Sequence, residues 1–271
     1  MQPNFLVEKS NWVRKETLKV HKLAPETRIA SSLSSVELFV ALYYGKVLKY
    51  DPTNLRAEDR DRLIVSKGHG SICLYPILAD LGFFDKKELL TVCKEGSFLG
   101  GIPDTLIPGY ETINGSLGHG LGVASGVAIG LKRKNRLESV FVVLGDGELY
   151  EGSVWEAVMF AGYHKLDNLI LIIDNNKICM LDYCSKILDL TPLADKFKAF
   201  GWMTQEVDGH NPAVMQEVLL KAKKDRNSKP KLIIAQTKKG KGVPKLENDS
   251  LCHVRSLSAQ EVDALVEESS L

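Results

Sequence analysis

Short apolar runs alternate with longer amphipathic stretches along most of the chain. The runs of strand length that are richest in apolar residues lie at 62–66, 138–144, 169–173, 202–207 and 231–236. Continuous apolar runs of this length are typical of strands that are buried on both faces of a parallel sheet. Between them apolar residues recur at helical spacing, which predicts helices over 70–82, 85–94, 116–132, 150–164, 192–200 and 212–224. We therefore expect an α/β fold, with a mostly parallel sheet and helices on both of its faces.

The first fifty residues follow a different, purely helical pattern. Residues 3–23 alternate apolar and charged positions at helical spacing. Ser34 and Glu37 have the spacing of a capping box, which predicts a second helix that runs to about Tyr44. The sheet is therefore expected to be preceded by a helical N-terminal arm.

Two later helices also carry start signals. We expect Thr191 to cap the helix over 192–200, with Pro192 in its first turn. Ser258 and Glu261 are expected to form a capping box at the start of a last helix.

The bulk composition limits the class of protein. The 271 residues are 44% hydrophobic, which is enough for a large buried core. We find no internal repeat and no low-complexity linker, so we interpret residues 1–271 as a single domain with a helical arm over about 1–50. Lysine and arginine (35) nearly balance aspartate and glutamate (34), so charge does not indicate nucleic acid or an anionic membrane as a partner.

Cysteine use and the N-terminus bear on the compartment. The five cysteines are an odd number without a Cys-x-x-Cys pair, which argues against a disulfide framework and against a structural zinc site. The first residues lack the apolar core of a signal peptide, and no apolar run approaches the roughly 20 residues that span a bilayer. We expect a cytoplasmic protein that does not cross a membrane.

The ends of two predicted strands carry the chemistry. One run is followed by Gly145-Asp146-Gly147, and the next run by an Asp-Asn-Asn sequence that includes Asn176. In open α/β sheets, ligands bind beyond the carboxyl ends of the strands. Glycines let a ligand approach the backbone, and the free N–H groups of a following helix attract an anion. Carboxylate and amide oxygens suit Mg²⁺ or Ca²⁺, so the pair predicts a cation shared with a diphosphate.

The spacing of these two motifs identifies a family. A Gly-Asp-Gly turn alone is equally consistent with an ordinary strand-to-helix connection. With Asn-Asn about thirty residues later, it is the signature of thiamine-diphosphate enzymes. The chain resembles the N-terminal, diphosphate-binding half of transketolases, especially those that are split into two subunits. The blocks that carry the resemblance occur in the expected order: SLSSVELFVALYYGKVLKYDP, RDRLIVSKGHG, NGSLGHGLGVASGVAIGLK, GDGELYEGSVWEA, DNNKI, PLADKFKAFGW and KGKGV.

The resemblance implies roles for individual residues at the cofactor. It implies that Asp146, the Asn176 side chain and the backbone carbonyl of Ile178 bind the divalent metal. Gly147 would lie against the diphosphate, and His69 would reach the diphosphate or the thiazolium; without its motif, His69 would be interpreted as a capping or core histidine. The residues that we expect to bind thiamine diphosphate are His69, Gly115, Leu117, Gly145, Asp146, Gly147, Glu148, Asn176 and Ile178. Glu148 is included without a specific role.

The block around residue 115 has two interpretations. By the resemblance, Gly115 and Leu117 pack beside the aminopyrimidine, a flat ring that suits a close-fitting apolar surface. The later part of the block is also consistent with a small-residue helix that packs tightly on a neighbour. His119 lies in the same turn and has either a functional or a purely structural role.

Two glutamates and one further histidine complete the expected site. Glu151 and Glu156 correspond to acidic positions at the dimer interface of the family, where close carboxylates share protons. A solvated helix face is the alternative for both. His253 corresponds to a histidine that points into the substrate channel. The expected catalytic residues are therefore His69, His253 and Glu151.

A lysine-rich, glycine-containing loop precedes His253. It contains Lys238, Lys239, Lys241 and Lys245. The loop is consistent with a lid that faces a phosphate and equally with a solvated surface loop.

Two departures from the family pattern concern the substrate. Arg28 stands where transketolases carry a histidine that contacts the substrate, and Ile102 replaces a histidine that hydrogen-bonds hydroxyls of the donor. Arginine is a permanent cation that binds carboxylates and phosphates, whereas isoleucine removes a hydrogen-bond partner. We expect Arg28, Ile102 and His253 to bind the substrate and to select a deoxy or otherwise modified sugar, or a pyruvate-like donor. Asp182, where many relatives have glycine, is a third departure, with no consequence that we can derive.

The expected function is transfer of a two-carbon ketol unit from a ketose to an aldose, with thiamine diphosphate and Mg²⁺ or Ca²⁺ as cofactors. In the family, the glutamate that activates the cofactor lies in a following pyrimidine-binding domain, and the chain ends before such a domain. We therefore expect a separate partner subunit and an α2β2 assembly. The alternatives are a thiamine-diphosphate-dependent 2-oxoacid lyase or decarboxylase component and a non-catalytic assembly subunit.

Overall fold

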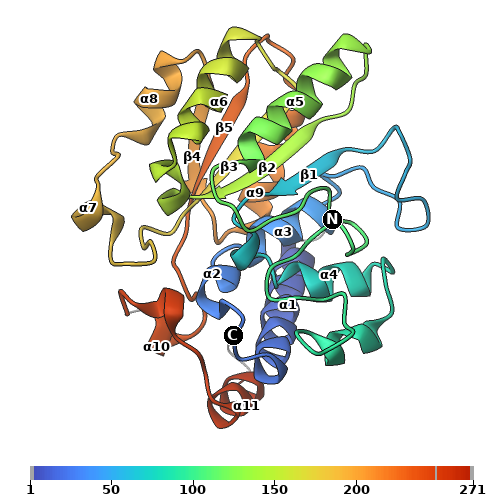
Figure 1. Ribbon diagram of the computed structural model, residues 1–271, viewed down its shortest axis with the longest axis vertical. Coiled ribbons are helices and arrows are strands. Elements are labelled where there is room, and N and C mark those ends of the chain that lie inside the picture. Colours follow the sequence, from blue (N-terminus) through green and yellow to red (C-terminus); the bar gives the residue numbers. More distant parts are fainter. Residues whose placement is uncertain (1–2, 248, 269–271) are drawn as a thin grey trace.

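The computed structural model describes residues 3–247 and 249–268, and its centre is a five-stranded parallel sheet (Figure 1). The spatial order is β1-β2-β3-β5-β4. The strands are β1 (Arg62–Val65), β2 (Val140–Gly145), β3 (Leu169–Asn175), β4 (Met203–Asp208) and β5 (Lys231–Gln236). All five predicted strands are thus present, with ends shifted by two residues at most, but the predicted burial is wrong for β4, an edge strand that is mostly exposed. Because every pairing is parallel, the carboxyl ends of the strands lie at one edge of the sheet.

Side chains that alternate along the strands face two separate apolar cores, as expected for a sheet that is covered on both sides. Phe141 and Val143 belong to one core, and Val142 and Leu144 to the other. The first core is closed by α1 (Pro3–Leu23), α3 (Val36–Tyr43), α4 (Leu74–Asp80) and α9 (Pro212–Lys224). The second is closed by α5 (Gly120–Arg133), α6 (Gly152–Tyr163) and α8 (Leu193–Ala199). The predicted α/β class, with helices on both faces, is therefore confirmed.

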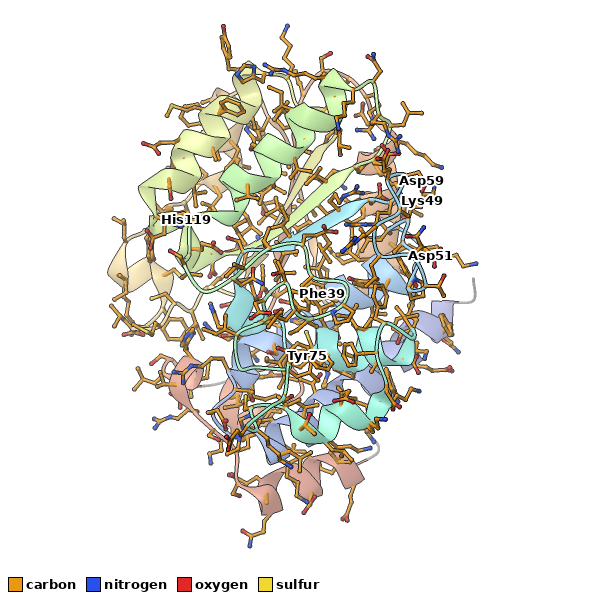
Figure 2. The ribbon with its side chains drawn as sticks, turned by 45° about the vertical axis from the view of Figure 1, so that its right-hand side comes forward. Phe39, Lys49, Asp51, Asp59, Tyr75 and His119 are labelled. Carbon is orange, nitrogen blue, oxygen red and sulfur yellow. The ribbon has the colours of Figure 1, made fainter. Side chains whose placement is uncertain are left out.

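Figure 2 shows how the first core is closed. Phe39 of α3 and Tyr75 of α4 are fully buried in it, whereas Lys49, Asp51 and Asp59 lie at the edge of the molecule. The predicted N-terminal arm is present as α1, whose apolar side chains pack into this core. The arm is therefore an integral layer of the fold.

The predicted capping box of Ser34 and Glu37 is wrong. The chain forms two short helices here, α2 (Ile29–Leu33) and α3, and Ser35 is the residue that precedes α3. The Ser34 hydroxyl donates to the carboxylate of Asp174 at 2.6 Å. The Glu37 carboxylate is buried and pairs with Arg14. Both side chains serve long-range polar contacts, which a local capping pattern does not reveal.

Other helix boundaries also differ from the expectation. The predicted helix over 70–82 is shorter, because a 3₁₀ turn at Gly68–Gly70 precedes α4, and the helix over 85–94 is a 3₁₀ segment at Lys86–Thr91. Thr191 does not cap α8, because its N–H and hydroxyl both donate to Asp189. The capping box of Ser258 and Glu261 is confirmed. The remaining helices are α7 (Cys184–Ile187), α10 (Pro244–Glu247) and α11 (Ala259–Glu267).

Two observations bear on the cysteines and on membrane spans. All five cysteines are free thiols, as their spacing predicted. The described residues contain no helix with both the length and the apolar character that a bilayer crossing requires. The longest described helix, α1, has 21 residues and carries charged side chains along its length.

Candidate functional site

A cavity of about 380 Å³ lies at the carboxyl ends of β1, β2 and β3. The register places Gly145 beside Asp174, so the two motifs that were singled out in the sequence begin next to each other. The predicted residues that line the cavity are His69, Gly115, Leu117, Gly145, Asp146, Gly147, Glu148, Asn176, Ile178 and His253. The structure thus brings all nine predicted cofactor-binding residues together, and the chemical role of each residue stays a prediction.

Asp146 is a buried carboxylate with no ion pair in the described part of the chain. Its Oδ1 accepts the N–H of Gly147 at 2.8 Å, and its Oδ2 accepts the N–H of Lys177. Burial and, second, the negative charge of Asp174 raise the pKa of Asp146 to about 6. A desolvated anion of this kind is stabilised by a bound cation, so Asp146 fits the predicted metal role.

Two neutral oxygens join Asp146 at the cavity. The Asn176 amide donates from Nδ2 to Asp174 at 3.2 Å, and its Oδ1 accepts the N–H of Ile178 at 3.2 Å. The carbonyl oxygen of Ile178 accepts the Lys239 ammonium at 2.6 Å. Carboxylate, amide and carbonyl oxygens are the donors that Mg²⁺ and Ca²⁺ prefer. Among the described residues, no three His, Cys, Asp or Glu side chains gather as a metal site, so a metal here relies on these neutral oxygens.

A buried ion pair that the sequence did not reveal supports this wall of the cavity. The Lys67 ammonium pairs with Asp174, and side-chain accessibility is 3% and 1% respectively. Asp174 also accepts the hydroxyls of Ser34 and Ser35, at 2.6 and 3.0 Å, and that of Thr237. Burial opposes its ionisation, but Lys67 and these hydroxyls hold the pKa of Asp174 well below its usual range. The lysine at the end of a buried strand was a signal for such a pair, although its partner could not be named.

Glu148, which the sequence left without a specific role, ties three motifs together. Its Oε1 accepts the Ser66 hydroxyl and, at 2.9 Å, the N–H of Gly118. Its Oε2 accepts the N–H of Gly145 at 3.3 Å. The side chain is buried, and burial raises its pKa. Glu148 therefore positions the loop of Gly115 and Leu117 against the Gly-Asp-Gly turn.

His69 and His253 face each other at the cavity, with ring centroids 5.1 Å apart. Burial and the charge of Lys67 lower the pKa of His69 to about 3, and burial and Lys239 lower the pKa of His253 to about 4. Both rings are therefore neutral near pH 7. Because Lys239 donates to Nδ1 of His253 at 3.1 Å, the hydrogen-bond network assigns the proton of that ring to Nε2. Each ring can donate one hydrogen bond and accept another.

The lysine loop after β5 divides between the two interpretations. Lys239 is 4% exposed and lines the cavity. Lys238 pairs with Glu247 at 2.7 Å, and Lys245 pairs with Glu261 at 2.5 Å, both at the surface. The loop is therefore neither a lid of lysines nor a purely solvated segment, because a single lysine enters the site.

Three predicted residues do not line the cavity. Arg28 is exposed, and its charge lowers the pKa of both His69 and His253, after larger effects of burial and of Lys239, so it lies near the two histidines. Ile102 is 51% exposed, and its Cγ2 is 3.7 Å from where a Cβ on Gly115 would stand. Both therefore lie at the rim. Glu151 is exposed and packs beside Gly118.

The two remaining candidates also lie at the surface. Glu156 is exposed on α6 and has no ion pair with any described residue. His119 is exposed and precedes α5, and its Nδ1 lies 3.2 Å from the Ser116 hydroxyl (Figure 2). For His119, this local contact supports the structural interpretation.

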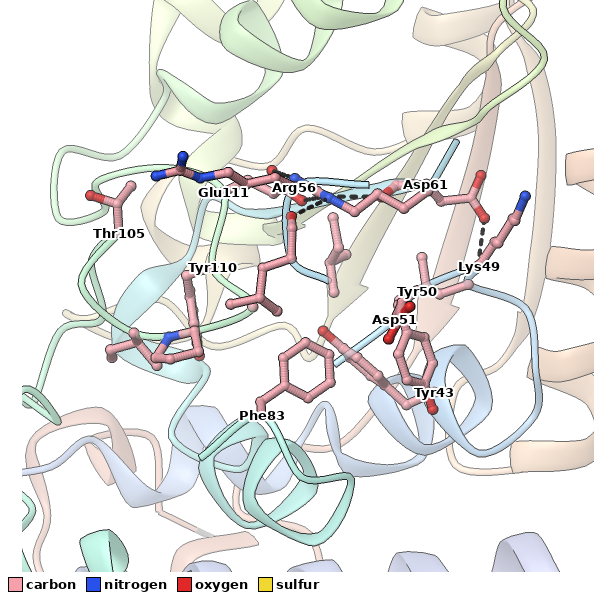
Figure 3. A pocket seen from close by; sticks show the side chains of 17 residues that line it. Tyr43, Lys49, Tyr50, Asp51, Arg56, Asp61, Phe83, Thr105, Tyr110 and Glu111 are labelled. Atoms are coloured by element: carbon pink, nitrogen blue, oxygen red, sulfur yellow. Dashed lines mark hydrogen bonds and ion pairs between the residues drawn. The ribbon is translucent and has the colours of Figure 1, made fainter. Parts of the chain in front are cut away.

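A second cavity, of about 300 Å³, lies near the amino end of β1 and contains none of the predicted site residues (Figure 3). Tyr43 and Phe83 form part of its apolar wall. Arg60 and Glu111 form an ion pair across it, with Nη2 and Oε2 2.9 Å apart. Because Glu111 lies between Ile102 and Gly115 in the chain, the ion pair restrains the segment that reaches the rim of the first cavity.

The fold and the first cavity together define an α/β protein with a polar cavity at the carboxyl ends of its parallel strands. Residues 30–270 match the family described as transketolase, thiamine diphosphate binding domain, and the chain belongs to this family. The predicted resemblance and the thiamine-diphosphate cofactor are thereby confirmed, as is the class of transketolase-type enzyme.

Two groups of relatives differ in length. The chain is 37% identical over 264 residues to 6-deoxy-6-sulfo-D-fructose transketolase subunit SqwG of Clostridium sp. (strain MSTE9), covering 97% of this chain and 95% of the relative. It is 37% identical over 265 residues to an apulose-4-phosphate transketolase subunit of Actinobacillus succinogenes, again covering 97% and 95%. The crystal structure of transketolase from Campylobacter jejuni superposes with a TM-score of 0.90 and 31% identity, covering 98% of this chain and 43% of that chain. The chain therefore spans less than half of that longer transketolase.

Proposed function

We propose that this chain is the diphosphate-binding subunit of a split transketolase-type enzyme, which moves a two-carbon ketol unit from a ketose to an aldose. The observation that carries the proposal is the cavity that joins Asp146, Asn176 and the Ile178 carbonyl to a pair of neutral histidines. An intact set of polar groups argues against a purely structural subunit.

The residues of the cavity fit the cofactor. Asp146, Asn176 and Ile178 would hold Mg²⁺, or Ca²⁺, and Lys239 adds a positive charge for the diphosphate. Gly115 and Leu117 would contact the aminopyrimidine. When bound, thiamine diphosphate supplies the electron sink for breaking and forming the carbon–carbon bond.

The two histidines would act on the substrate. Because both are neutral near pH 7, His69 can accept or donate a hydrogen bond at a substrate oxygen, and His253 can donate one. His253 would bind the substrate with Nε2–H, since Nδ1 already accepts from Lys239. Glu151, exposed beside Gly118, would lie at a subunit boundary.

A separate subunit would supply the pyrimidine-binding domain and the glutamate that activates the cofactor. The two relatives that the chain spans almost from end to end are both named as subunits. Met180 and Leu181 line the cavity and are 58% and 61% exposed, an apolar surface that a partner would cover. The proposed assembly is α2β2, and the proposed compartment is the cytoplasm, where free thiols persist.

The proposed substrate is a modified sugar. The named activities of the two relatives concern 6-deoxy-6-sulfo-D-fructose and apulose 4-phosphate. Arg28 offers an exposed guanidinium near the two histidines, which suits a sulfonate, phosphate or carboxylate group. Ile102 presents an apolar surface beside Gly115, where a hydroxyl would find no partner.

The test is a donor panel with the chain and its co-purified partner subunit. Ketol transfer from sulfofructose or apulose 4-phosphate, with weak turnover of xylulose 5-phosphate and ribose 5-phosphate, is the expected result. Ordinary efficiency with the two unmodified sugars would refute the substrate proposal. Activity with pyruvate alone would favour the 2-oxoacid alternative, and absence of cofactor binding by the complex would favour a non-catalytic subunit.

A further inference from the structure

A buried polar cluster outside the cavity joins α1, α3 and the turn between β4 and α9. Glu37 of α3 is 5% exposed, and its Oε1 pairs with Arg14 of α1. Its Oε2 lies 3.0 Å from Nδ1 of His210. None of the three side chains lines the cofactor cavity, so the predicted function assigns them no role.

The cluster holds the backbone on both sides of Lys239. Nε2 of His210 accepts the N–H of Lys238 at 2.8 Å, and Nη1 of Arg14 donates to the carbonyl oxygen of Lys241 at 2.9 Å. Between these two anchors, the Lys239 side chain turns into the cavity and donates to the Ile178 carbonyl at 2.6 Å.

The hydrogen bonds define the form of His210. A carboxylate only accepts hydrogen bonds, so Nδ1 of His210 must carry a proton and donate a hydrogen bond to Glu37. Nε2 must then be unprotonated, so that it can accept the hydrogen bond from the N–H of Lys238. Glu37 thus orients the His210 ring, in the way that outer-shell carboxylates orient ligating histidines. The ring is fixed with its acceptor towards the lysine loop.

We propose that Arg14, Glu37 and His210 are positioning residues that set the affinity of the cavity for a diphosphate by fixing Lys239. The inference rests on the proposed function of the cavity. A lysine loses considerable side-chain freedom on burial, and two backbone anchors restrict its loop before any ligand arrives.

Two substitutions at His210 separate the two hydrogen bonds. His210→Asn keeps a donor near the Nδ1 position for Glu37 and removes the acceptor for Lys238. His210→Gln keeps an acceptor near the Nε2 position. Calorimetric titration of each full-length variant with inorganic pyrophosphate and Mg²⁺, and then with thiamine diphosphate and Mg²⁺, measures the effect.

His210→Asn is expected to weaken pyrophosphate binding about tenfold, the lower end of outer-shell effects, and His210→Gln is expected to restore most of it. In a Lys239→Ala background, His210→Asn should not weaken pyrophosphate binding further, because the side chain that His210 positions is already absent. Hydrogen exchange of the peptide containing residues 238–241 should quicken in His210→Asn and not in His210→Gln.

Three outcomes would overturn the inference. One is equal affinity of His210→Asn and the unmodified protein. Another is an equal loss in the Lys239→Ala background, which would indicate a general structural role. In the third outcome, the unmodified protein binds neither probe, and the proposed function then fails together with the inference. If Lys239→Ala weakens pyrophosphate binding and His210→Asn does not, the inference alone is refuted.

Discussion

The inner wall of the cavity and its rim are built in opposite ways. On the inner wall, Asp174 pairs with Lys67 and accepts hydroxyls from the turn between α2 and α3 and from the loop after β5, and nearly all of these groups are buried. At the rim, the side chains of Arg28 and Ile102 are exposed, and Arg28 makes no ion pair with a described residue. If the proposed roles hold, cofactor binding depends on side chains that also stabilise the fold, whereas substrate choice depends on exposed side chains that can change at little cost in stability.

The largest effect is expected from breaking the inner wall. Lys67→Met leaves the Asp174 carboxylate buried without its cation, which is expected to lower the free energy of unfolding by about 3–5 kcal/mol. Urea denaturation measures the loss. As a control, Lys198→Met breaks an exposed pair with Asp195 and is expected to cost less than about 1 kcal/mol. If both substitutions had equally small effects on the free energy of unfolding, the contrast between the buried inner wall and exposed side chains would be wrong.

Asp146→Asn tests the metal role, because it removes the negative charge of the side chain and leaves its size almost unchanged. It is expected to weaken binding of thiamine diphosphate with Mg²⁺ by at least about 100-fold, since outer-shell changes alone reach 10–100-fold. Stability without ligand should change little, because two effects oppose each other. The amide removes a carboxylate whose pKa burial raises to about 6, but it leaves one of the backbone N–H groups of Gly147 and Lys177 without an acceptor. The exposed Asp195→Asn is the matched control, and unchanged affinity in Asp146→Asn would exclude the metal role.

The segment that follows His253 should respond to pH through His21. Nε2 of this buried ring accepts the N–H of Leu257 at 3.1 Å, and Nδ1 lies 2.8 Å from the Thr27 hydroxyl. Burial, only partly offset by Glu26, lowers the pKa of His21 to about 4 from its ordinary value of 6.5. The unfolded chain therefore takes up this proton first, and stability present above about pH 6.5 is lost as the pH falls towards 4.

Between pH 7 and pH 5, His21 is expected to lower the free energy of unfolding by about 2 kcal/mol, as the two pKa values and the linkage relation give. Denaturation midpoints over this range measure it. His21→Gln keeps an acceptor for the Leu257 N–H but does not titrate, so the slope should flatten by that amount. An unchanged slope in His21→Gln would assign the pH dependence to other groups.

The smallest effect is expected at the rim. Ile102→His and Arg28→His should each shift the ratio of kcat/KM between a modified and an unmodified donor by about tenfold, because a partner for a hydroxyl is gained or a partner for an anion is lost. Affinity for thiamine diphosphate should stay within about twofold of that of the unmodified protein. The free energy of unfolding should change by less than about 0.5 kcal/mol, as for other surface substitutions. A large loss of cofactor affinity would show that the rim and the inner wall are one unit.

The same contrast explains what could be predicted from the sequence. β2, β3 and β5 could be predicted because their continuous apolar runs follow from burial on both faces of the sheet. Asp146 and Asn176 could be placed because each follows its strand directly. The pair of Lys67 and Asp174 could not be predicted, because Lys67 lies in the turn after β1 and Asp174 in β3, and their pairing depends on the fold. Ser34 and Glu37 have the spacing of a capping box, but their side chains bind Asp174 and Arg14 instead of capping the helix.

The lysine loop shows a second limit. Four lysines within eight positions look alike in the sequence, and the contacts that distinguish Lys239 come from segments far away in the chain. The roles of the site residues and the single-domain interpretation stay predictions.

The central claim is that the two strand-end motifs hold the metal and diphosphate of the cofactor. A crystal structure of the chain with thiamine diphosphate and Mg²⁺ tests it most directly. The predicted result is a metal about 2.0–2.2 Å from oxygens of Asp146, Asn176 and the Ile178 carbonyl, with the diphosphate against Gly147. A cofactor bound elsewhere, or a metal that contacts none of these three oxygens, would contradict the account.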